Sequence, residues 1–293
     1  GHMDLVVANY RREFEYDIES YIYRGTDSGF DRTPVRLPSH FALQAAVGDL
    51  NGDGFSEVVF AGGNQLWIYW NRNGQFNPDD RTILDFTGGL TEMEFRIGAI
   101  FAHIADIDGD GKNELIVAAA QGIEIRRQDD LTVTASEIPL ASCTWLHTAD
   151  LTGDGSLDMI ASRYQDGESF NCESAVFWNG SGGYSLERAT WLATSGAMGC
   201  TAGDLNGDGK PEIIFNSTHT GWSRWDPKFP LYVYLGNEHN EYSTDRRLAL
   251  PTGHSNTYLV ADLNQDGYAD LACTSRLGLR IFYGGPEGLN PER

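Results

Sequence analysis

The sequence has few basic residues, few cysteines and no long hydrophobic run, and each shortage disfavours a class of protein. Only 21 of the 293 residues are Lys or Arg, against 42 Asp or Glu, which gives a formal net charge of −21. A chain this acidic is ill suited to nucleic acid or to an anionic membrane surface, because both require a basic face. No apolar stretch approaches the ~18 residues of a membrane span, so we expect no membrane insertion. The four cysteines form no CxxC pair, which disfavours zinc-binding and thioredoxin-like sites.

The usual signatures of catalysis are also missing. The sequence contains no G-x-S-x-G, H-E-x-x-H, P-loop or dinucleotide-binding motif. A pair of acids for glycoside hydrolysis cannot be singled out, because a repeated loop contains the obvious acids. No segment has a sustained helical period, which disfavours α/β folds.

What the sequence does contain is a repeat. Nine-residue acidic segments begin at Asp49, Asp106, Asp150, Asp204 and Asp262, spaced 57, 44, 54 and 58 residues apart. A truncated copy begins near residue 4, after three residues (Gly1 to Met3) that are typical of an expression scar. Self-similarity at this period is typical of repeat architectures. We therefore expect one domain over residues 4–293.

Each repeat predicts four short strands joined by hairpins. A short strand enters the acidic segment, an apolar strand such as 58–60 leaves it, and an aromatic-rich strand such as 66–70 follows. A Gly-rich turn and a more polar fourth strand complete the unit, and the 34 glycines agree with many tight turns. The prediction is an all-β β-propeller of four-stranded antiparallel blades. Six blades with one imperfect blade are favoured, and a truncated seven-bladed ring is the alternative.

The acidic segments predict metal sites. They share the pattern D-x-[NDT]-x-D-G-x-x-[DE], in which oxygen side chains at the first, third and fifth positions converge inside a tight turn and the ninth closes the site. Five such segments hold sixteen of the 42 acids, more than twice their share by length. Hard oxygen ligands in a flexible loop suit Ca²⁺. An EF-hand is excluded because the twelfth position, for example Phe60 or Val117, is apolar.

We therefore expect up to five Ca²⁺ ions, which would change the formal charge from −21 to −11. The alternative is a set of Asn/Asp/Gly turns without metal. The segment at Asp106 has four acids and should bind best, whereas Thr152 and Gln265 depart from the pattern and weaken their sites. The candidate ligands are Asp49, Asn51, Asp53, Glu57, Asp106, Asp108, Asp110, Glu114, Asp150, Thr152, Asp154, Asp158, Asp204, Asn206, Asp208, Glu212, Asp262, Asn264, Asp266 and Asp270.

These segments resemble the FG-GAP/VCBS repeats of integrin-α-like calcium-binding β-propellers. The resemblance runs from Asp4 to the C-terminus and is closest in the segments at Asp49, Asp106 and Asp204. It implies Ca²⁺ in the loop between the first two strands of a blade, on one face of the molecule. The family includes adhesion receptors, fungal lectins and accessory domains of secreted polysaccharide-degrading enzymes, so the resemblance indicates fold and metal better than ligand.

A ligand is expected on the loops opposite the calcium face. Three of these loops are long and aromatic, at 10–19, 163–173 and 219–230. The candidate ligand-binding residues are Trp222, Trp225, Arg224 and Phe170, because exposed aromatic rings beside charges suit sugar stacking or a protein interface. The alternative is that the rings cap the blades. A disulfide among Cys143, Cys172 and Cys200 and buried free thiols are both compatible with the sequence.

Two functions from different classes remain. The first is an extracellular or cell-surface, calcium-stabilised module that binds a glycan or protein and has no catalytic residues. The second is a secreted polysaccharide lyase or hydrolase, or its accessory domain. Acids, His or Tyr that converge in a pocket away from the calcium loops would favour the enzyme.

Overall fold

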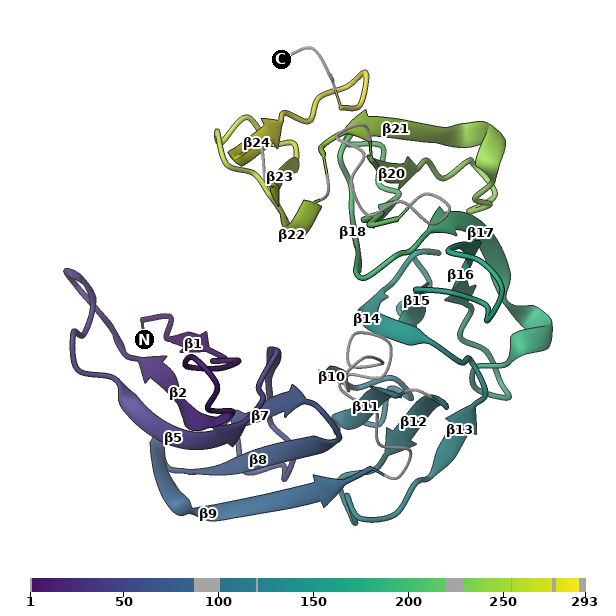
Figure 1. Cartoon of the computed structure of the whole chain (residues 1–293). Coiled ribbons are helices and arrows are strands. Elements are labelled where there is room, and N and C mark those ends of the chain that lie inside the picture. The colour runs from purple at the N-terminus through teal and green to yellow at the C-terminus, as the bar shows by residue number, and fades with distance from the viewer. Residues whose placement is uncertain are drawn as a thin grey trace. The chain divides into compact units, whose positions relative to one another are not determined.

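The computed structural model is built from antiparallel β-sheets (Figure 1). It describes residues 2–86, 101–119, 121–219, 229–253, 255–275 and 278–289. These residues contain strands and two short 3-10 helices, η1 (Leu186–Arg188) and η2 (Thr244–Arg246), and no helix among them is long and apolar enough to cross a membrane. The chain divides into two compact units, Gly1–Leu140 and Ala141–Arg293, which we describe separately.

The first unit contains three successive sheets and a small hairpin. The three-stranded sheet consists of β1 (Leu5–Val7), β2 (Asp17–Tyr23) and β5 (Val35–His40), and the hairpin β3 (Gly25–Thr26)–β4 (Gly29–Phe30) follows β2. The next sheet consists of β6 (Gln44–Gly48), β7 (Glu57–Gly62), β8 (Gln65–Arg72) and β9 (Gln75–Asp85). The third consists of β10 (Phe101–Ala105), β11 (Glu114–Ala119), β12 (Gly122–Arg126) and β13 (Ser136–Ile138).

The second unit repeats the plan. Its first sheet consists of β14 (Cys143–Ala149), β15 (Asp158–Arg163), β16 (Asn171–Phe177) and β17 (Thr190–Ser195). The second consists of β18 (Cys200–Gly203), β19 (Glu212–Phe215), β20 (Pro230–Tyr234) and β21 (Arg247–Pro251). The last consists of β22 (Ser255–Ala261), β23 (Asp270–Ser275) and β24 (Gly278–Phe282).

This strand order confirms the predicted all-β class and its antiparallel blades of up to four strands. Among the described residues, four sheets are complete, the first lacks an opening strand and the last lacks a closing one, as the repeats predict. The number of blades in a closed ring stays a prediction, and so does the single domain over residues 4–293.

The register of the strands is the same around every acidic loop. The residue before the first Asp pairs with the ninth residue of the loop, so eight residues form the connection between the first and second strands. The pairs are Gly48 with Glu57, Ala105 with Glu114, Ala149 with Asp158, Gly203 with Glu212 and Ala261 with Asp270. Antiparallel order places the connection between the third and fourth strands at this same end of each sheet.

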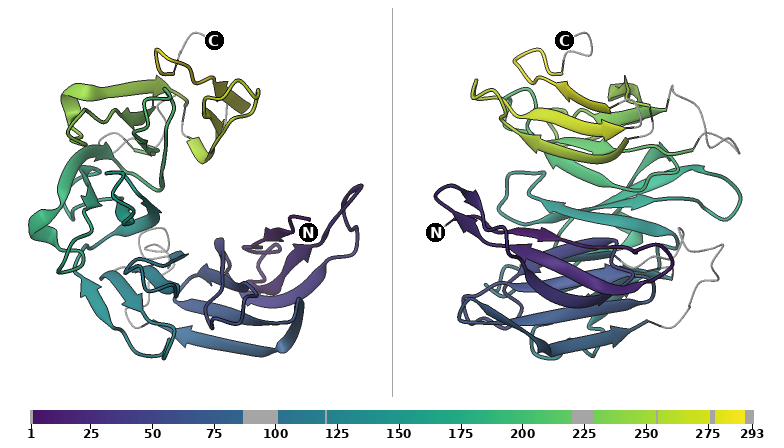
Figure 2. Two further views of the ribbon diagram at one scale, coloured as in Figure 1. Left: turned by 180° about the vertical axis from the view of Figure 1, so that it is seen from behind. Right: turned by 60° about the vertical axis from the view of Figure 1, so that its left-hand side comes forward.

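The core lies between the faces of successive sheets in each unit. The second strands are the most buried, and every residue of β7 and β11 is buried, which explains their continuous apolar sequence. In the second unit, Ile160 and Val176 of one sheet share a cluster with Ile213 and Tyr234 of the next. Figure 2 shows these teal and green sheets side by side in both views.

Candidate functional site

The first aspartate of each acidic loop organises the backbone of the turn. Asp49 accepts hydrogen bonds from the N–H groups of Gly52 at 2.7 Å and Gly54 at 2.8 Å. The bond from the sixth position recurs in the other four loops, as Gly111 to Asp106, Gly155 to Asp150, Gly209 to Asp204 and Gly267 to Asp262. Burial alone would raise the pKa of Asp49, but the N–H groups of Gly54 and Gly52 outweigh it and hold the pKa below its usual value.

The third and fifth positions stabilise the turn in the same way. The Oδ1 of Asn51 accepts the N–H of Asp53 at 2.9 Å, and the Oδ1 of Asp53 accepts the N–H of Phe55 at 2.9 Å. The loops that begin at residues 106, 204 and 262 repeat both bonds. Thr152 departs from this pattern, because its hydroxyl turns to Asp150 at 3.5 Å. Each turn therefore holds several side-chain oxygens close together.

The ninth position supplies a buried carboxylate in every loop. Glu57, Glu114, Asp158, Glu212 and Asp270 are at most 3 % exposed. Each accepts the N–H of the second loop residue, as Glu57 does from Leu50 at 2.7 Å and Glu212 from Leu205 at 2.8 Å. In three blades the carboxylate also accepts an N–H from the end of the third strand, from Asn71, Asn179 and Gly284.

Burial next to other carboxylates makes four of these groups, Glu57, Glu114, Asp158 and Glu212, poor anions in the metal-free protein. Desolvation, followed by the charges of Asp208 and Asp204, raises the pKa of Glu212 to about 7. Desolvation, with Asp154 and Asp150, raises the pKa of Asp158 to about 6. Desolvation also raises the pKa of Glu57 and Glu114. A cation held among these oxygens would remove the penalty that raises the pKa values.

The loop at Asp106 brings its carboxylates closest together. Oxygens of Asp106, Asp108 and Glu114 lie within 4.8 Å of one another, which is the spacing of ligands around one hard cation. Asp110 is not part of this group of three. The donor set consists of oxygens alone and therefore fits Ca²⁺.

The turn needs left-handed backbone at its fourth and sixth positions. Gly52 and Gly54 have φ values of 74° and 86°, and the glycines of the next three loops match them. Gln265 takes the fourth position of the last loop at a φ of 63°, so a residue with a side chain occupies a conformation that favours glycine. The replacement of glycine by glutamine at this position therefore introduces local backbone strain.

The predicted ligand-binding residues are only partly described. Trp222, Arg224 and Trp225 lie outside the described residues, and their role stays a prediction. Phe170 is half-buried and stacks on His219, with ring centroids 4.6 Å apart and planes 22° apart. It also meets Tyr164 edge-on at 5.0 Å, so in this structure Phe170 packs within a cluster of rings.

The aromatic loop between β1 and β2 of the first unit is described in full. Tyr10 and Tyr16 pack on Phe41, with ring centroids 4.4 and 4.8 Å apart, while Phe14 is 89 % exposed. Two of its three rings therefore pack against Phe41, and the third is exposed. Elsewhere, Cys143, Cys172 and Cys200 are buried free thiols, and desolvation raises the pKa of Cys143 to about 12.

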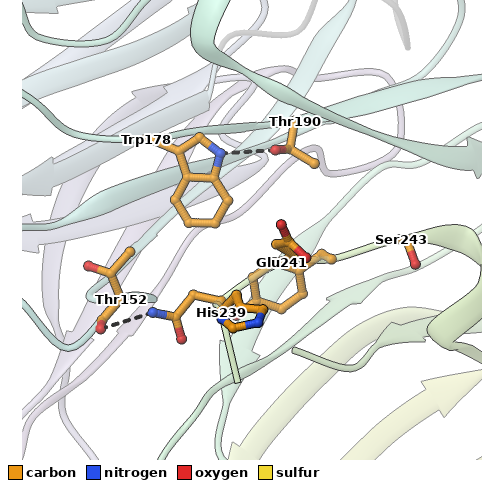
Figure 3. A pocket seen from close by; sticks show the side chains of 8 residues that line it. Thr152, Trp178, Thr190, His239, Glu241 and Ser243 are labelled. Atoms are coloured by element: carbon orange, nitrogen blue, oxygen red, sulfur yellow. Dashed lines mark hydrogen bonds between the residues drawn. The ribbon is translucent and has the colours of Figure 1, made fainter. Parts of the chain in front are cut away.

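A pocket that the sequence did not indicate lies at the acidic-loop end of the second unit. A cavity of about 540 Å³ is lined by Trp178, Thr190, the loop residue Thr152, and residues 239–243 that follow β20 (Figure 3). The Nε1 of Trp178 donates to Thr190 Oγ1 at 2.9 Å, and Asn240 Nδ2 donates to the carbonyl of Thr152 at 3.2 Å. The signal in the sequence was Trp178 at the end of an aromatic strand, which by itself is typical of packing.

Comparison with known proteins identifies one family and several solved structures of one fold. The model of the FG-GAP-like repeat matches residues 49–117, 106–161 and 150–215. The structure of an Agrocybe aegerita lectin that recognises non-reducing terminal N-acetylglucosamine is similar, with a TM-score of 0.60 and 16% identity over 99% of this chain and 75% of the lectin chain.

Two further solved structures share the fold. A chain from the complex of BBS1N with ARL6DN has a TM-score of 0.58 and 14% identity over 96% of this chain and 75% of that chain. The exotype rhamnogalacturonan lyase YesX has a TM-score of 0.50 and 15% identity over 94% of this chain and 55% of that chain. At these identities the likeness shows the β-propeller fold alone.

Proposed function

Because this chain belongs to the FG-GAP-like repeat family, we propose that it is a calcium-stabilised β-propeller module that binds a glycan and does not transform it. The observation that carries the proposal is the uniform geometry of the acidic loops. Each loop joins the first two strands of its sheet in the same register. Each has a buried carboxylate at the ninth position and exposed or half-exposed oxygen side chains at the first, third and fifth positions.

Calcium would supply positive charge to this set of carboxylates. Asp106, Asp108 and Glu114 would hold one ion, and the corresponding residues of the other loops would hold up to four more. Sites of this kind in extracellular modules bind Ca²⁺ with dissociation constants of about 10⁻⁴ to 10⁻³ M. We therefore propose an extracellular or cell-surface location, where calcium is abundant enough to fill weak sites.

A glycan is the ligand that the available features favour. The lectin with the same fold recognises a terminal N-acetylglucosamine. The cavity beside Trp178 has an aromatic wall and a polar rim, which is the composition of a pocket for a small polar ligand. The strong negative charge disfavours acidic polymers as ligands. The single loop 219–230, with Trp222 and Trp225, remains a second predicted contact region.

A glycan microarray tests the proposal directly. The protein is applied in millimolar calcium and, in parallel, in excess chelator. We expect binding to a defined set of glycans that weakens in chelator, with the bound glycans recovered intact by mass spectrometry. Failure to bind any glycan in calcium would overturn the binding function. Release of unsaturated or reducing-end sugars from a bound glycan would instead support a polysaccharide-degrading enzyme.

A further inference from the structure

One cavity in the second unit has the features of a built site for a small ligand. It lies where two successive blades meet, between Trp178 and Thr190 of one blade and residues 239–243 of the next, and its volume is about 540 Å³ (Figure 3). We propose that this pocket binds one pyranose ring of a neutral glycan. The proposal rests on the proposed function, because it names the site and the sugar class of that binding module.

The aromatic wall of the pocket is fixed in place. Trp178 is half-buried, and its Nε1 donates to Thr190 Oγ1 at 2.9 Å. Tyr242 stacks on it, with ring centroids 6.1 Å apart and planes 22° apart, and the Tyr242 hydroxyl donates to the carbonyl of Pro211 at 2.8 Å. Aromatic rings held in this way offer an apolar face to the C–H groups of a sugar at little entropic cost.

The side chain of Asn237 orders the polar rim from within its own loop. The Oδ1 of Asn237 accepts the N–H groups of His239 at 2.8 Å and Glu241 at 2.9 Å, and its Nδ2 donates to Glu241 Oε2 at 2.9 Å. The Glu241 carboxylate is thereby aimed by its own loop while it stays exposed. A carboxylate accepts two sugar hydroxyls in strong charge-assisted hydrogen bonds.

Both neighbouring acidic loops hold the rim. Asn240 donates to the carbonyl of Thr152 in the loop of the preceding blade, at 3.2 Å. Lys210 Nζ, in the acidic loop of the same blade, donates to the carbonyl of Asn237 at 2.6 Å. The rim is therefore tied to two turns that the fold already fixes, and such preorganisation favours specific binding.

The charges of the pocket select against acidic sugars. The ionisable groups among the residues that line it are Glu241, His239 and Tyr242, and the whole chain has a formal charge of −21. Desolvation raises the pKa of the Tyr242 hydroxyl, so this group stays neutral. A uronic acid bound in the pocket would place its carboxylate near that of Glu241, and the lining contains no Arg or Lys to pair with it. The two negative charges would repel each other. A neutral pyranose satisfies the same rim with hydroxyl groups.

The test uses the whole chain and three trisaccharides in millimolar calcium. Triacetylchitotriose and cellotriose are neutral probes, and trigalacturonic acid is the acidic probe. We expect titration calorimetry to give measurable binding of a neutral trisaccharide and affinity for the acidic one that is weaker by about tenfold or more. Trp178→Ala and Glu241→Gln should each weaken neutral binding by about tenfold or more.

Matched controls separate the pocket from the fold. Trp70 makes the equivalent bond to Thr82 in the first unit, at 3.1 Å, so Trp70→Ala removes the same contact elsewhere. Glu238 is in the same loop as Glu241 and does not line the cavity, so Glu238→Gln removes a nearby charge. Both controls should bind as the unchanged protein does. Glu241→Gln alters an exposed side chain, so it remains informative if Trp178→Ala fails to fold.

The outcomes distinguish this proposal from the function on which it rests. If neutral trisaccharides bind but Glu241→Gln and Trp178→Ala bind equally well, the pocket assignment is wrong and the glycan-binding function stands. Preference for trigalacturonic acid would overturn the neutral class. If neither neutral probe binds, the proposal is wrong, and the microarray shows whether glycan binding also fails.

Discussion

Replacing Glu212 by glutamine should stabilise the metal-free protein at high pH, which is unusual for the removal of a buried charge. Desolvation and the neighbouring Asp208 and Asp204 raise the pKa of Glu212 from 4.5 to about 7. This rise corresponds to ~3 kcal/mol. The folded protein therefore holds this proton more tightly than the unfolded chain does, so metal-free stability falls as the pH increases from 4.5 through about 7.

Glutamine has nearly the shape of the carboxylic acid but does not ionise. Its side-chain oxygen can still accept the N–H of Leu205, which the carboxylate accepts at 2.8 Å. The bond from Asn206 at 3.2 Å is the part that glutamine replaces less well. Subtracting about 1 kcal/mol for that bond leaves a gain of roughly 2 kcal/mol at about pH 8. Near pH 5, where Glu212 is protonated, the two proteins should be equally stable.

Urea unfolding in excess chelator, monitored by tryptophan fluorescence, measures the difference in free energy of unfolding between the two proteins at about pH 8 and about pH 5. Glu238→Gln is the control, because Glu238 is exposed and outside the acidic loops. Saturating calcium at about pH 8 should reverse the order, since the ion stabilises the ionised Glu212 and loses a ligand in the variant. A Glu212→Gln protein that is less stable than the original at high pH without metal would refute the electrostatic account of the loop.

Three other predictions follow from the loops and the blade contacts. Chelation should lower the melting temperature, because each calcium site at 100 times its dissociation constant contributes ~2.7 kcal/mol to stability. Calorimetry should show that Asp106→Asn removes a tighter calcium site than Asp150→Asn does. A melting temperature that chelator leaves unchanged would contradict both predictions. Gln265→Gly should raise the free energy of unfolding by about 0.5–1 kcal/mol. Glycine relieves the strain of a φ of 63°, but it also increases the conformational entropy of the unfolded chain, which offsets part of the gain. A loss of stability would show that the strain is absent. Gly203→Ala should lower the free energy of unfolding by about 1–3 kcal/mol, because a Cβ at this position would lie 2.4 Å from Cγ1 of Val260. In a double-mutant cycle, Val260→Ala in the same chain should recover part of this loss. No recovery would show that the two strands do not touch at these residues.

The sequence was sufficient to predict the blades and the geometry of the acidic loops. Those features depend on interactions within about ten residues, such as the bonds from Gly52 and Gly54 to Asp49 and the pairing of Gly48 with Glu57. Because the same local pattern recurs, five copies support one interpretation far better than a single copy would. Burial of the ninth carboxylate was harder to predict from the sequence, since it depends on the third strand of the sheet as well.

The pocket could not be predicted, because its walls come from separate parts of the chain. Trp178 and Tyr242 are 64 positions apart, and each has a local explanation as an aromatic residue near a strand end. Only the stacking of two blades brings them together. The same reasoning applies to Phe170, which its sequence neighbours indicate as an exposed candidate and which the structure stacks on His219, 49 positions away. Aromatic composition thus indicates where rings lie in the sequence, but not which rings meet.

The acidic loops connect the two proposals physically. The rim of the pocket is held by Thr152 of one loop and Lys210 of the next, through bonds to Asn240 and Asn237. Any ion that orders those loops therefore also restricts the residues that would contact a sugar. Coupling between two bound ligands is reciprocal, so a sugar that fixes Asn240 must strengthen calcium binding by the same factor by which calcium strengthens sugar binding. The repeated loop would then act on binding through the rigidity that it gives to the edge of each blade, without itself contacting the glycan.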